Sequence, residues 1–342
     1  MSGLPAELKA FYEAVYYLVF NLARAVLAFM QRDSYLYWPF IVSTLVIMVF
    51  AARWTVLRAP QGLTWRQQFR AYFAKGIWWH PSARADYRLY FVNALVLPAF
   101  FGWVLFGDAQ VAGFMDAMLG RSPTVAGGSE AGIGVRLAYT VLFFIAYDLG
   151  RFAAHCLLHD VPALWEFHKV HHSAEVLTPF TAYRAHPVDL LVMAWVPAVL
   201  TGLLTWLFNL VSPGLIGAYT FLGMHVFLWA VNLIDNLRHS NVWITYGPHV
   251  GKWIVSPAHH QLHHSYEPRH AMNGHGGCNR GFSLAVWDRW YGTLCLPERE
   301  PEKFRVGLGD GTDSGWHSVL HMYAWPFKGG FRSLRDAFSR RT

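Results

Sequence analysis

Residues 137–172 read LAYTVLFFIAYDLGRFAAHCLLHDVPALWEFHKVHH, an apolar run that leads directly into a cluster of histidines. A helix needs roughly 20 apolar residues to cross the hydrocarbon layer of a membrane, and Leu137–His155 is close to that length. His155 and His159 are four residues apart, so they share one helical face and could reach the same metal ion. The stretch therefore predicts a membrane-spanning helix that ends in a pair of candidate metal ligands.

Two further histidine clusters follow the same spacing rule. Both have the pattern HxxHH, in which positions i, i+3 and i+4 fall on one helical face. Three neutral imidazoles side by side need their ring nitrogens satisfied by water or by a metal ion. The first cluster consists of His168, His171 and His172, and the second of His260, His263 and His264. His259 leaves the register of the second cluster open, because it also stands four residues before His263.

The number and type of these residues narrow the choice of metal. A single further histidine, His239, follows another apolar run. Imidazole suits iron, zinc, copper and nickel, and this many imidazoles exceed the needs of one tetrahedral ion, which indicates two metal ions. The zinc-protease motif HExxH does not occur in the sequence. A bis-histidine haem would need histidine pairs at membrane depth, whereas these clusters lie at the ends of the apolar runs.

The composition of the whole chain agrees with a membrane protein. Of its 342 residues, 54% are hydrophobic and only 14% are charged, against about 25% charged in average soluble domains. This excludes a disordered chain, which needs low hydrophobicity and high net charge. The net charge is +7, and because the basic residues flank apolar runs we expect them to face anionic lipids rather than nucleic acid. Three cysteines without CxxC spacing predict no disulfide framework, and we expect no cleavable signal peptide.

Hydropathy predicts further spans, and the charges of the loops predict their orientation. The loop between the first two spans is strongly basic, while residues 108–134 contain a single arginine. By the positive-inside rule, the basic loop, the histidine clusters and the C-terminus are expected in the cytoplasm. The other candidate spans are Leu36–Ala52, Leu89–Gly107, Val188–Phe208 and Pro213–Ile234, with Phe11–Met30 expected to be interfacial or bundle-facing. We therefore predict an all-α, integral-membrane helical bundle of about four to six transmembrane or interfacial helices, with a cytoplasmic histidine-rich helical cap.

The histidine clusters and several flanking motifs resemble those of the fatty acid hydroxylase/sterol desaturase superfamily. The resemblance runs from about Tyr147 to Leu296, and its further motifs are Arg184-Ala185-His186-Pro187, His239-Ser240-Asn241 and Asn279-x-Gly281…Trp287-Asp288…Gly292-Thr293. It implies an integral-membrane, non-haem di-iron enzyme that uses O₂ and two electrons to hydroxylate, or desaturate, an unactivated C–H bond of a lipid. Zinc could substitute for iron in a purified sample. The ligands that the resemblance implies are His155, His159, His168, His171, His172, His239, His260, His263 and His264.

The resemblance also implies partners and a domain organisation. The sequence shows no flavin, nicotinamide or cytochrome motif, so we expect an external electron donor, cytochrome b5-like or a ferredoxin with its reductase. We expect N-terminal membrane helices with a basic loop (1–135), a histidine-box catalytic domain (136–296) and a cytoplasmic tail (297–342). Candidates for orienting the ligand imidazoles from outside are Asp148, Asp235, His186 and Asn279, although Asp148 could instead pair with Arg151.

The substrate and two alternative functions remain open at this stage. The lipid could be a sterol, a fatty acyl chain, an ether lipid, a carotenoid or an aminolipid. A zinc-dependent membrane hydrolase and a non-catalytic membrane metal-binding protein would use the same histidines. His225 lies within a predicted span and is expected to be buried and hydrogen-bonded, whereas His317 and His321 are expected on an amphipathic interfacial segment.

Overall fold

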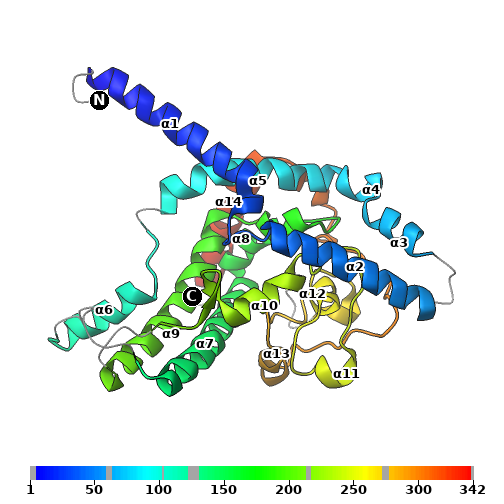
Figure 1. The fold of residues 1–342 in the computed structure, drawn as a ribbon. Helices are drawn as coiled ribbons and strands as arrows, with labels where there is room; N and C mark the ends of the chain where they lie inside the picture. Colours follow the sequence, from blue (N-terminus) through cyan, green and yellow to red (C-terminus); the bar gives the residue numbers. More distant parts are fainter. Residues whose placement is uncertain are drawn as a thin grey trace.

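The fold is helical almost throughout, as the sequence predicts (Figure 1). The computed structural model describes residues 5–58, 64–101, 104–121, 131–212, 217–271 and 277–339. Within these ranges the only paired strands are β1 (Thr220–Phe221) and β2 (Met224–His225), which form an antiparallel hairpin with Phe221 opposite Met224.

The helices differ widely in length. The longer ones are α1 (Ala6–Val26), α2 (Trp38–Arg58), α5 (Pro81–Phe101), α6 (Asp108–Met118), α7 (Ile133–Asp160), α8 (Pro162–His172), α9 (Pro187–Val211), α10 (Val226–Asp235) and α14 (Val319–Ser339). The shorter ones are α3 (Trp65–Tyr72), α4 (Lys75–Trp78), α11 (Gly247–Val250), α12 (Pro257–His263) and α13 (Val286–Tyr291), with 3₁₀ turns η1 (Leu27–Met30), η2 (Pro179–Tyr183), η3 (Pro268–His270) and η4 (Asp313–His317).

Helices α7 and α9 pack side by side (Figure 1). Gly150 of α7 faces Pro197 of α9 so closely that a Cβ atom at position 150 would lie 2.5 Å from the Pro197 Cα. Only glycine allows this approach, because any larger residue would force the two backbones apart. The close contact fixes the end of α7 that carries His155 and His159 beside the beginning of α9.

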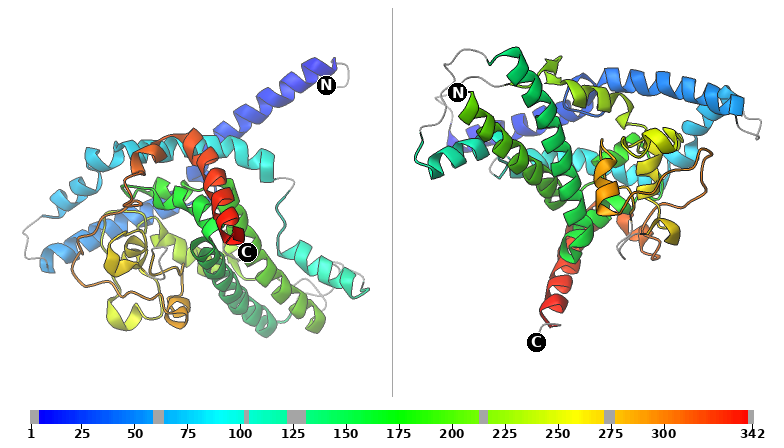
Figure 2. Two further views of the ribbon diagram at one scale, coloured as in Figure 1. Left: turned by 180° about the vertical axis from the view of Figure 1, so that it is seen from behind. Right: turned by 90° about the horizontal axis from the view of Figure 1, so that it is seen from below.

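In the described part of the chain, three helices are long and apolar enough to cross a membrane. These are the segment Glu7–Met30, α7 and α9, while Trp38–Phe50 and α10 are shorter apolar helices. On α1 large apolar side chains are exposed, among them Phe11 and Tyr16, and α1 extends away from the body of the molecule (Figure 2). The end of α14 also extends beyond the body and exposes Phe331 and Phe338.

Two sequence-based expectations about spans are wrong. Pro213–Ile234 is not one helix, because in the part that the structure describes the chain turns at Leu222 and Gly223, both with positive φ, and only the ten residues of α10 are helical. A hydropathy window cannot detect a tight hairpin turn of this kind inside an apolar run. Leu89–Gly107 is not one helix either, because α5 ends at Phe101 and residues 104–107 are not helical. Phe11–Met30, expected to be interfacial or bundle-facing, falls within Glu7–Met30, which by length and hydropathy could also cross a membrane.

A buried arginine ties the helices around the centre together. The Arg184 guanidinium is completely buried and lies 2.6 Å from the Asp86 carboxylate of α5. It also donates hydrogen bonds to the carbonyl oxygens of Val170 on α8 and Trp316 in η4. Because a buried charge requires partners on every side, this residue fixes the positions of three segments that are distant in the sequence.

Candidate metal centre

The nine predicted ligand histidines lie in two groups of neighbouring rings. Group A consists of His155, His159, His168, His172 and His263, and group B of His171, His239, His260 and His264. Within each group, one ring nitrogen from every histidine lies within 4.8 Å of the others. The rings come from α7, α8, α12 and the turns that follow α10 and α12.

In group A the Nε2 atoms face one another because the Nδ1 atoms are already engaged. The Nδ1–H of His155 donates to the carbonyl oxygen of Arg280 at 2.7 Å, and that of His263 donates to the carbonyl of Cys278 at 2.8 Å. The Nδ1–H of His168 donates to the Asp189 carboxylate at 2.8 Å. These acceptors fix the tautomer, so each Nε2 carries a lone pair and no proton.

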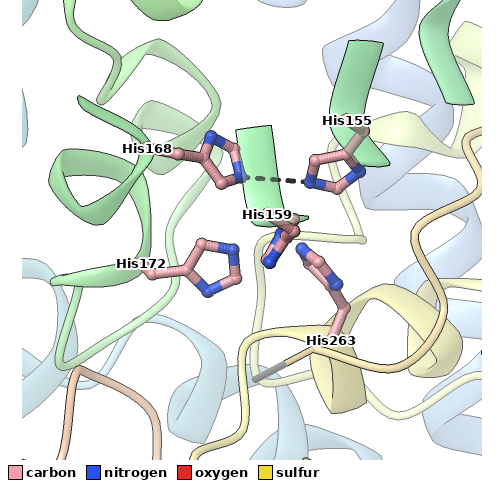
Figure 3. A group of neighbouring side chains, drawn as sticks. All are labelled: His155, His159, His168, His172 and His263. Atoms are coloured by element: carbon pink, nitrogen blue, oxygen red, sulfur yellow. Dashed lines mark hydrogen bonds between the residues drawn. The ribbon is translucent and has the colours of Figure 1, made fainter. Parts of the chain in front are cut away.

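The resulting arrangement of lone pairs requires a cation. The Nε2 atoms of His155 and His168 are 3.1 Å apart, and neither has a proton to donate to the other (Figure 3). Two nitrogen lone pairs at that distance repel each other unless a positive charge lies between or beside them. The buried Nε2 atoms of His172 and His263, and both ring nitrogens of His159, have no hydrogen-bond partner among the described residues. Group A therefore has the donor set of a metal site.

Group B has the same construction. The Nδ1–H of His171 donates to the carbonyl oxygen of Arg184 at 3.2 Å. The Nε2 atom of His239 lies 3.4 Å from that of His171 and 2.9 Å from that of His260. The Nε2 atom of His264 is 3.3 Å from that of His260, so four Nε2 atoms surround one point.

The two groups adjoin one another. The ring centroids of His172 in group A and His264 in group B are 4.8 Å apart, and those of His260 and His263 are 5.3 Å apart. Two ions held by these groups would be close neighbours, an arrangement in which both can act on one substrate. The all-nitrogen donor set suits iron, zinc or copper and does not suit magnesium or calcium, which prefer oxygen.

The electrostatic environment keeps these imidazoles neutral. Burial, followed by the positive charge that a protonated His168 would carry, lowers the pKa of His171 to about 4. Burial likewise lowers the pKa values of His239, His260 and His264 well below the usual value, with neighbouring rings as the next cause. At neutral pH the rings therefore present lone pairs, which is the protonation state that binds a metal ion.

The four residues proposed from the sequence as outer contacts do not touch the nine imidazoles with their hydrogen-bonding groups in the part of the chain that the structure describes. Asp148 accepts hydrogen bonds from the backbone of Ser283 and Leu284 and from the Trp287 indole. It forms no ion pair with Arg151, since all its acceptor contacts lie in this loop. Asn279 bonds to the backbone of Cys295 and His259.

The other two candidates also have different partners. The Asp235 carboxylate lies 2.9 Å from the Arg238 guanidinium. His186 accepts from the backbone N–H of Val188 at the start of α9 and donates to the carbonyl of Tyr323. Among the described residues, none of these four side chains therefore hydrogen-bonds to one of the nine rings. Asp148 instead fixes the loop that contains Arg280.

The side chain that does orient a ligand ring is Asp189, which sequence reasoning missed. It lies in the first turn of α9, where a carboxylate is favoured by the helix dipole, and it is almost completely buried. The remaining outer contacts are backbone carbonyls, and their positions depend on side chains elsewhere. The carbonyl of Arg280 is fixed because its guanidinium forms two 2.8 Å hydrogen bonds to Asp160, while its backbone N–H donates to Asp288.

The remaining histidines have structural contacts. His259 is not in either group, since its Nδ1 accepts from the backbone N–H of Ser256 at the start of α12. His260, and not His259, is therefore the residue of the second HxxHH cluster that joins group B. His225 is buried and donates to the carbonyl of Thr140, as expected. His317 pairs with Glu175, and His321 stacks on Trp325 at the beginning of α14. His275 lies outside the described residues.

A pocket of about 400 Å³ adjoins both histidine groups. His155 and His168 of group A and His171, His239 and His260 of group B form part of its wall. Much of the remaining wall is apolar, contributed by residues such as Leu97 of α5 and Leu190 and Met193 of α9. Such a pocket accommodates an apolar molecule with one end beside the metal-binding rings.

Comparison with known proteins gives consistent results. The model of the fatty acid hydroxylase family matches residues 140–293, which contain all nine histidines. The chain is 31% identical over 180 residues to a Delta(7)-sterol 5(6)-desaturase of Gibberella zeae, a match covering 50% of this chain and 48% of that protein. It is 30% identical over 193 residues to an ornithine lipid hydroxylase of Rhizobium tropici, covering 55% and 50%.

A third relative extends the range of chemistry. An alkylglycerol monooxygenase of Xenopus tropicalis is 26% identical over 162 residues, which is 46% of this chain and 31% of that protein. The matched segments thus span about half the length, or less, of these curated relatives. No solved structure matches the chain.

Proposed function

Since residues 140–293 match the fatty acid hydroxylase family and the chain is similar to a sterol desaturase and an ornithine lipid hydroxylase, we propose that it is a membrane di-iron monooxygenase acting on a lipid. It would hydroxylate, or desaturate, an unactivated C–H bond with O₂ and two electrons from an external carrier. The observation that carries the proposal is the convergence of two all-imidazole groups beside one apolar pocket. Bound iron would supply the activation of O₂ and the removal of hydrogen from the substrate carbon.

In this proposal, the residues around the metal centre either bind the ions or hold the rings that bind them. The nine imidazoles would bind the two ions, with Nε2 as the donor atom of the four rings whose Nδ1–H is engaged. Asp189 and the carbonyls of Arg280, Cys278 and Arg184 hold these rings in the binding tautomer. An imidazole that donates to a carboxylate is also a stronger base, so the Asp189 contact would strengthen the metal bond of His168.

The pocket would position the lipid and limit the access of water. An alkyl chain makes no polar contacts, so it binds where it can bury the most apolar surface. The apolar side chains of α5 and α9 provide that surface in this pocket. Exclusion of water protects a reactive oxidant from unproductive reduction and proton transfer. The carbon to be oxidised would lie at the end of the pocket formed by His155 and His168.

We propose that α7, α9 and the segment Glu7–Met30 lie in the membrane, with the histidine groups at its cytoplasmic edge. The support for this orientation is the strongly basic loop between α2 and α5, which the positive-inside rule assigns to the cytoplasm. The electron donor would dock from the same side and be cytochrome b5-like or a ferredoxin with its reductase.

The proposal is tested with full-length protein purified without oxygen and reconstituted in lipid nanodiscs. Metal analysis should find two iron ions per chain, and extracted lipids should contain a product with one additional oxygen, or two fewer hydrogens, only when O₂ and electrons are supplied. One zinc ion with an O₂-independent hydrolytic product would refute the proposal in favour of a hydrolase. Bound metal without any lipid product would favour a metal-binding protein without turnover.

A further inference from the structure

Arg151 places a positive charge in the wall of the pocket, one helical turn from a metal-binding histidine. It stands four residues before His155 on α7, so the two side chains share a face and are separated by about 6 Å along the helix axis. Phe282, also in the pocket wall, lies flat beneath the guanidinium, with 3.7 Å between the guanidinium carbon and the ring centroid. The Phe282 ring therefore covers one face of the guanidinium. The N–H groups lie in the guanidinium plane, so they point past this ring.

The carboxylates around Arg151 are committed to other partners. Asp235 lies 2.9 Å from Arg238, and Asp189 accepts from His168. Both oxygens of Asp148 accept hydrogen bonds from the loop that follows Phe282. Among the described residues, no carboxylate lies within ion-pair distance of Arg151. Its near polar neighbours are the hydroxyl groups of Tyr35 and Tyr147, and Asp235 and Asp148 act on it from farther away. The pocket wall contains two arginines and two aspartates, and Arg151 is the arginine of this wall that has no carboxylate at ion-pair distance among the described residues.

The positive charge of Arg151 in the pocket wall destabilises the folded protein unless a bound anion compensates it. An unpaired cation in a largely apolar environment is destabilised by the loss of water, and an aromatic ring on one face offsets only part of that loss. The planar fork of N–H groups in arginine matches the two oxygens of a carboxylate or phosphate. A hydroxyl group, as on a sterol, would leave the charge unneutralised.

We propose that Arg151 binds an acidic group, a carboxylate or a phosphate, of the lipid substrate, and that the oxidised carbon is only a few carbon atoms from this group. The inference rests on the proposed function and narrows its substrate class to acidic lipids oxidised near their polar end. The short distance follows from the single helical turn between Arg151 and His155, since the substrate must reach both.

Binding of matched probes tests the proposal without turnover. Full-length protein in non-ionic detergent is loaded with zinc, and the retention of radiolabelled palmitate is compared with that of hexadecanol, which has the same chain and a neutral end. A charge-assisted hydrogen bond predicts that palmitate binds about 10- to 100-fold more tightly than hexadecanol. Competition by hexadecyl phosphate and by sodium acetate separates a phosphate-bearing lipid from a carboxylate lipid and from a small free anion.

Three variants assign the effect to this side chain. Arg151→Gln should lower palmitate affinity to the level of hexadecanol, while Arg151→Lys should keep most of the preference because it keeps the charge. Arg305→Gln is the matched control, since Arg305 also lies over an aromatic ring, that of Tyr266, but is exposed. Unchanged zinc content and an unchanged circular dichroism spectrum show that each variant is folded.

The outcomes distinguish this inference from the function on which it rests. Equal binding of palmitate and hexadecanol by the unmodified protein, or an undiminished preference in Arg151→Gln, would overturn the inference. Displacement of palmitate by acetate at the same concentration as by hexadecyl phosphate would also overturn it, because it would indicate a simple anion site. Absence of any O₂-dependent lipid product from the iron-loaded protein would instead refute the proposed function.

Discussion

Replacing Asp189 by asparagine tests whether the outer carboxylate tunes the metal centre. The carboxylate accepts a 2.8 Å hydrogen bond from the Nδ1–H of His168, and both side chains are buried. Asparagine has nearly the same shape, but it is neutral, and its amide can turn so that NH₂ faces the ring. The ring would then keep its proton on Nε2, the atom that has to face the metal ion.

The expected magnitude follows from contacts of this kind in other metal sites. Loss of an outer hydrogen bond lowers metal affinity by about 10- to 100-fold, which corresponds to about 1.4 to 2.8 kcal/mol. Because His168 belongs to group A, one of the two ions should be bound more weakly and the other should keep its affinity. Anaerobic titration of the metal-free protein with Fe(II), followed by equilibrium dialysis, measures the two affinities.

The matched control is Asp116→Asn. Asp116 is also buried and accepts a hydrogen bond from a side-chain N–H, that of Trp206, but it belongs to α6 and contacts no ligand ring. Equal losses of iron affinity in the two variants would show that the effect is a general consequence of a changed buried carboxylate. Full retention of both affinities in Asp189→Asn would refute the reasoning that the carboxylate sets the tautomer.

Four further outcomes are expected. His264→Ala should reduce the iron content measured by elemental analysis from two ions per chain to one, and two retained ions would remove His264 from the ligand set. Arg184→Met leaves Asp86 buried without its partner and should lower the free energy of unfolding, measured by urea titration in detergent, by about 3 to 5 kcal/mol; an unchanged value would be contrary evidence. Gly150→Ala places a Cβ against Pro197 and should lower the melting temperature by an amount equivalent to about 1 to 3 kcal/mol. Gly134→Ala on the same helix places a Cβ where no atom lies within 4 Å, so it should leave the melting temperature unchanged. The pKa of His171 is about 4 in the folded, metal-free protein, against a usual value of 6.5, so the unfolded chain binds more protons between these pH values. The free energy of unfolding should therefore fall as the pH is lowered from 6.5 to 4, by up to about 1.4 kcal/mol per pH unit. A constant melting temperature over that range would contradict this expectation.

The sequence predicts the members of the centre but not their division between two groups. In the stretch His168–His172, the first and last histidines enter group A and His171 enters group B. Successive helical residues differ by about 100°, so positions i+3 and i+4 diverge on either side of position i. A single HxxHH motif therefore directs its rings toward two points, and which ring reaches which ion depends on how α8 packs against α12. The position of α8 depends on contacts distant in the sequence, such as those of Arg184 with Val170 and Asp86.

The outer contacts could not be identified from spacing at all. Asp189 is 21 residues from His168 and lies on a different helix, so no local pattern connects them. The available signal was an aspartate in the first turn of an otherwise apolar helix, which is expensive in a membrane unless it faces a partner. Three of the other acceptors are backbone carbonyls, which have no sequence signature. Predicting those of Arg280 and Cys278 requires the path of the loop 277–284, and this path is fixed by Asp148, Asp160 and Asp288.

Four side chains with different tasks lie along one face of α7. Asp148, Arg151, His155 and His159 follow one another at spacings of three and four residues, and each lies on the same stripe. Asp148 anchors the loop that supplies the carbonyl acceptor of His155, Arg151 lines the pocket, and the two histidines contribute to group A. The helix rise of about 1.5 Å per residue fixes the distances between these tasks, so the separation between a bound acidic group and the metal ions cannot adapt to different lipids. A lipid would then be selected by how far its reactive carbon stands from its polar end, rather than by the length of the remaining chain.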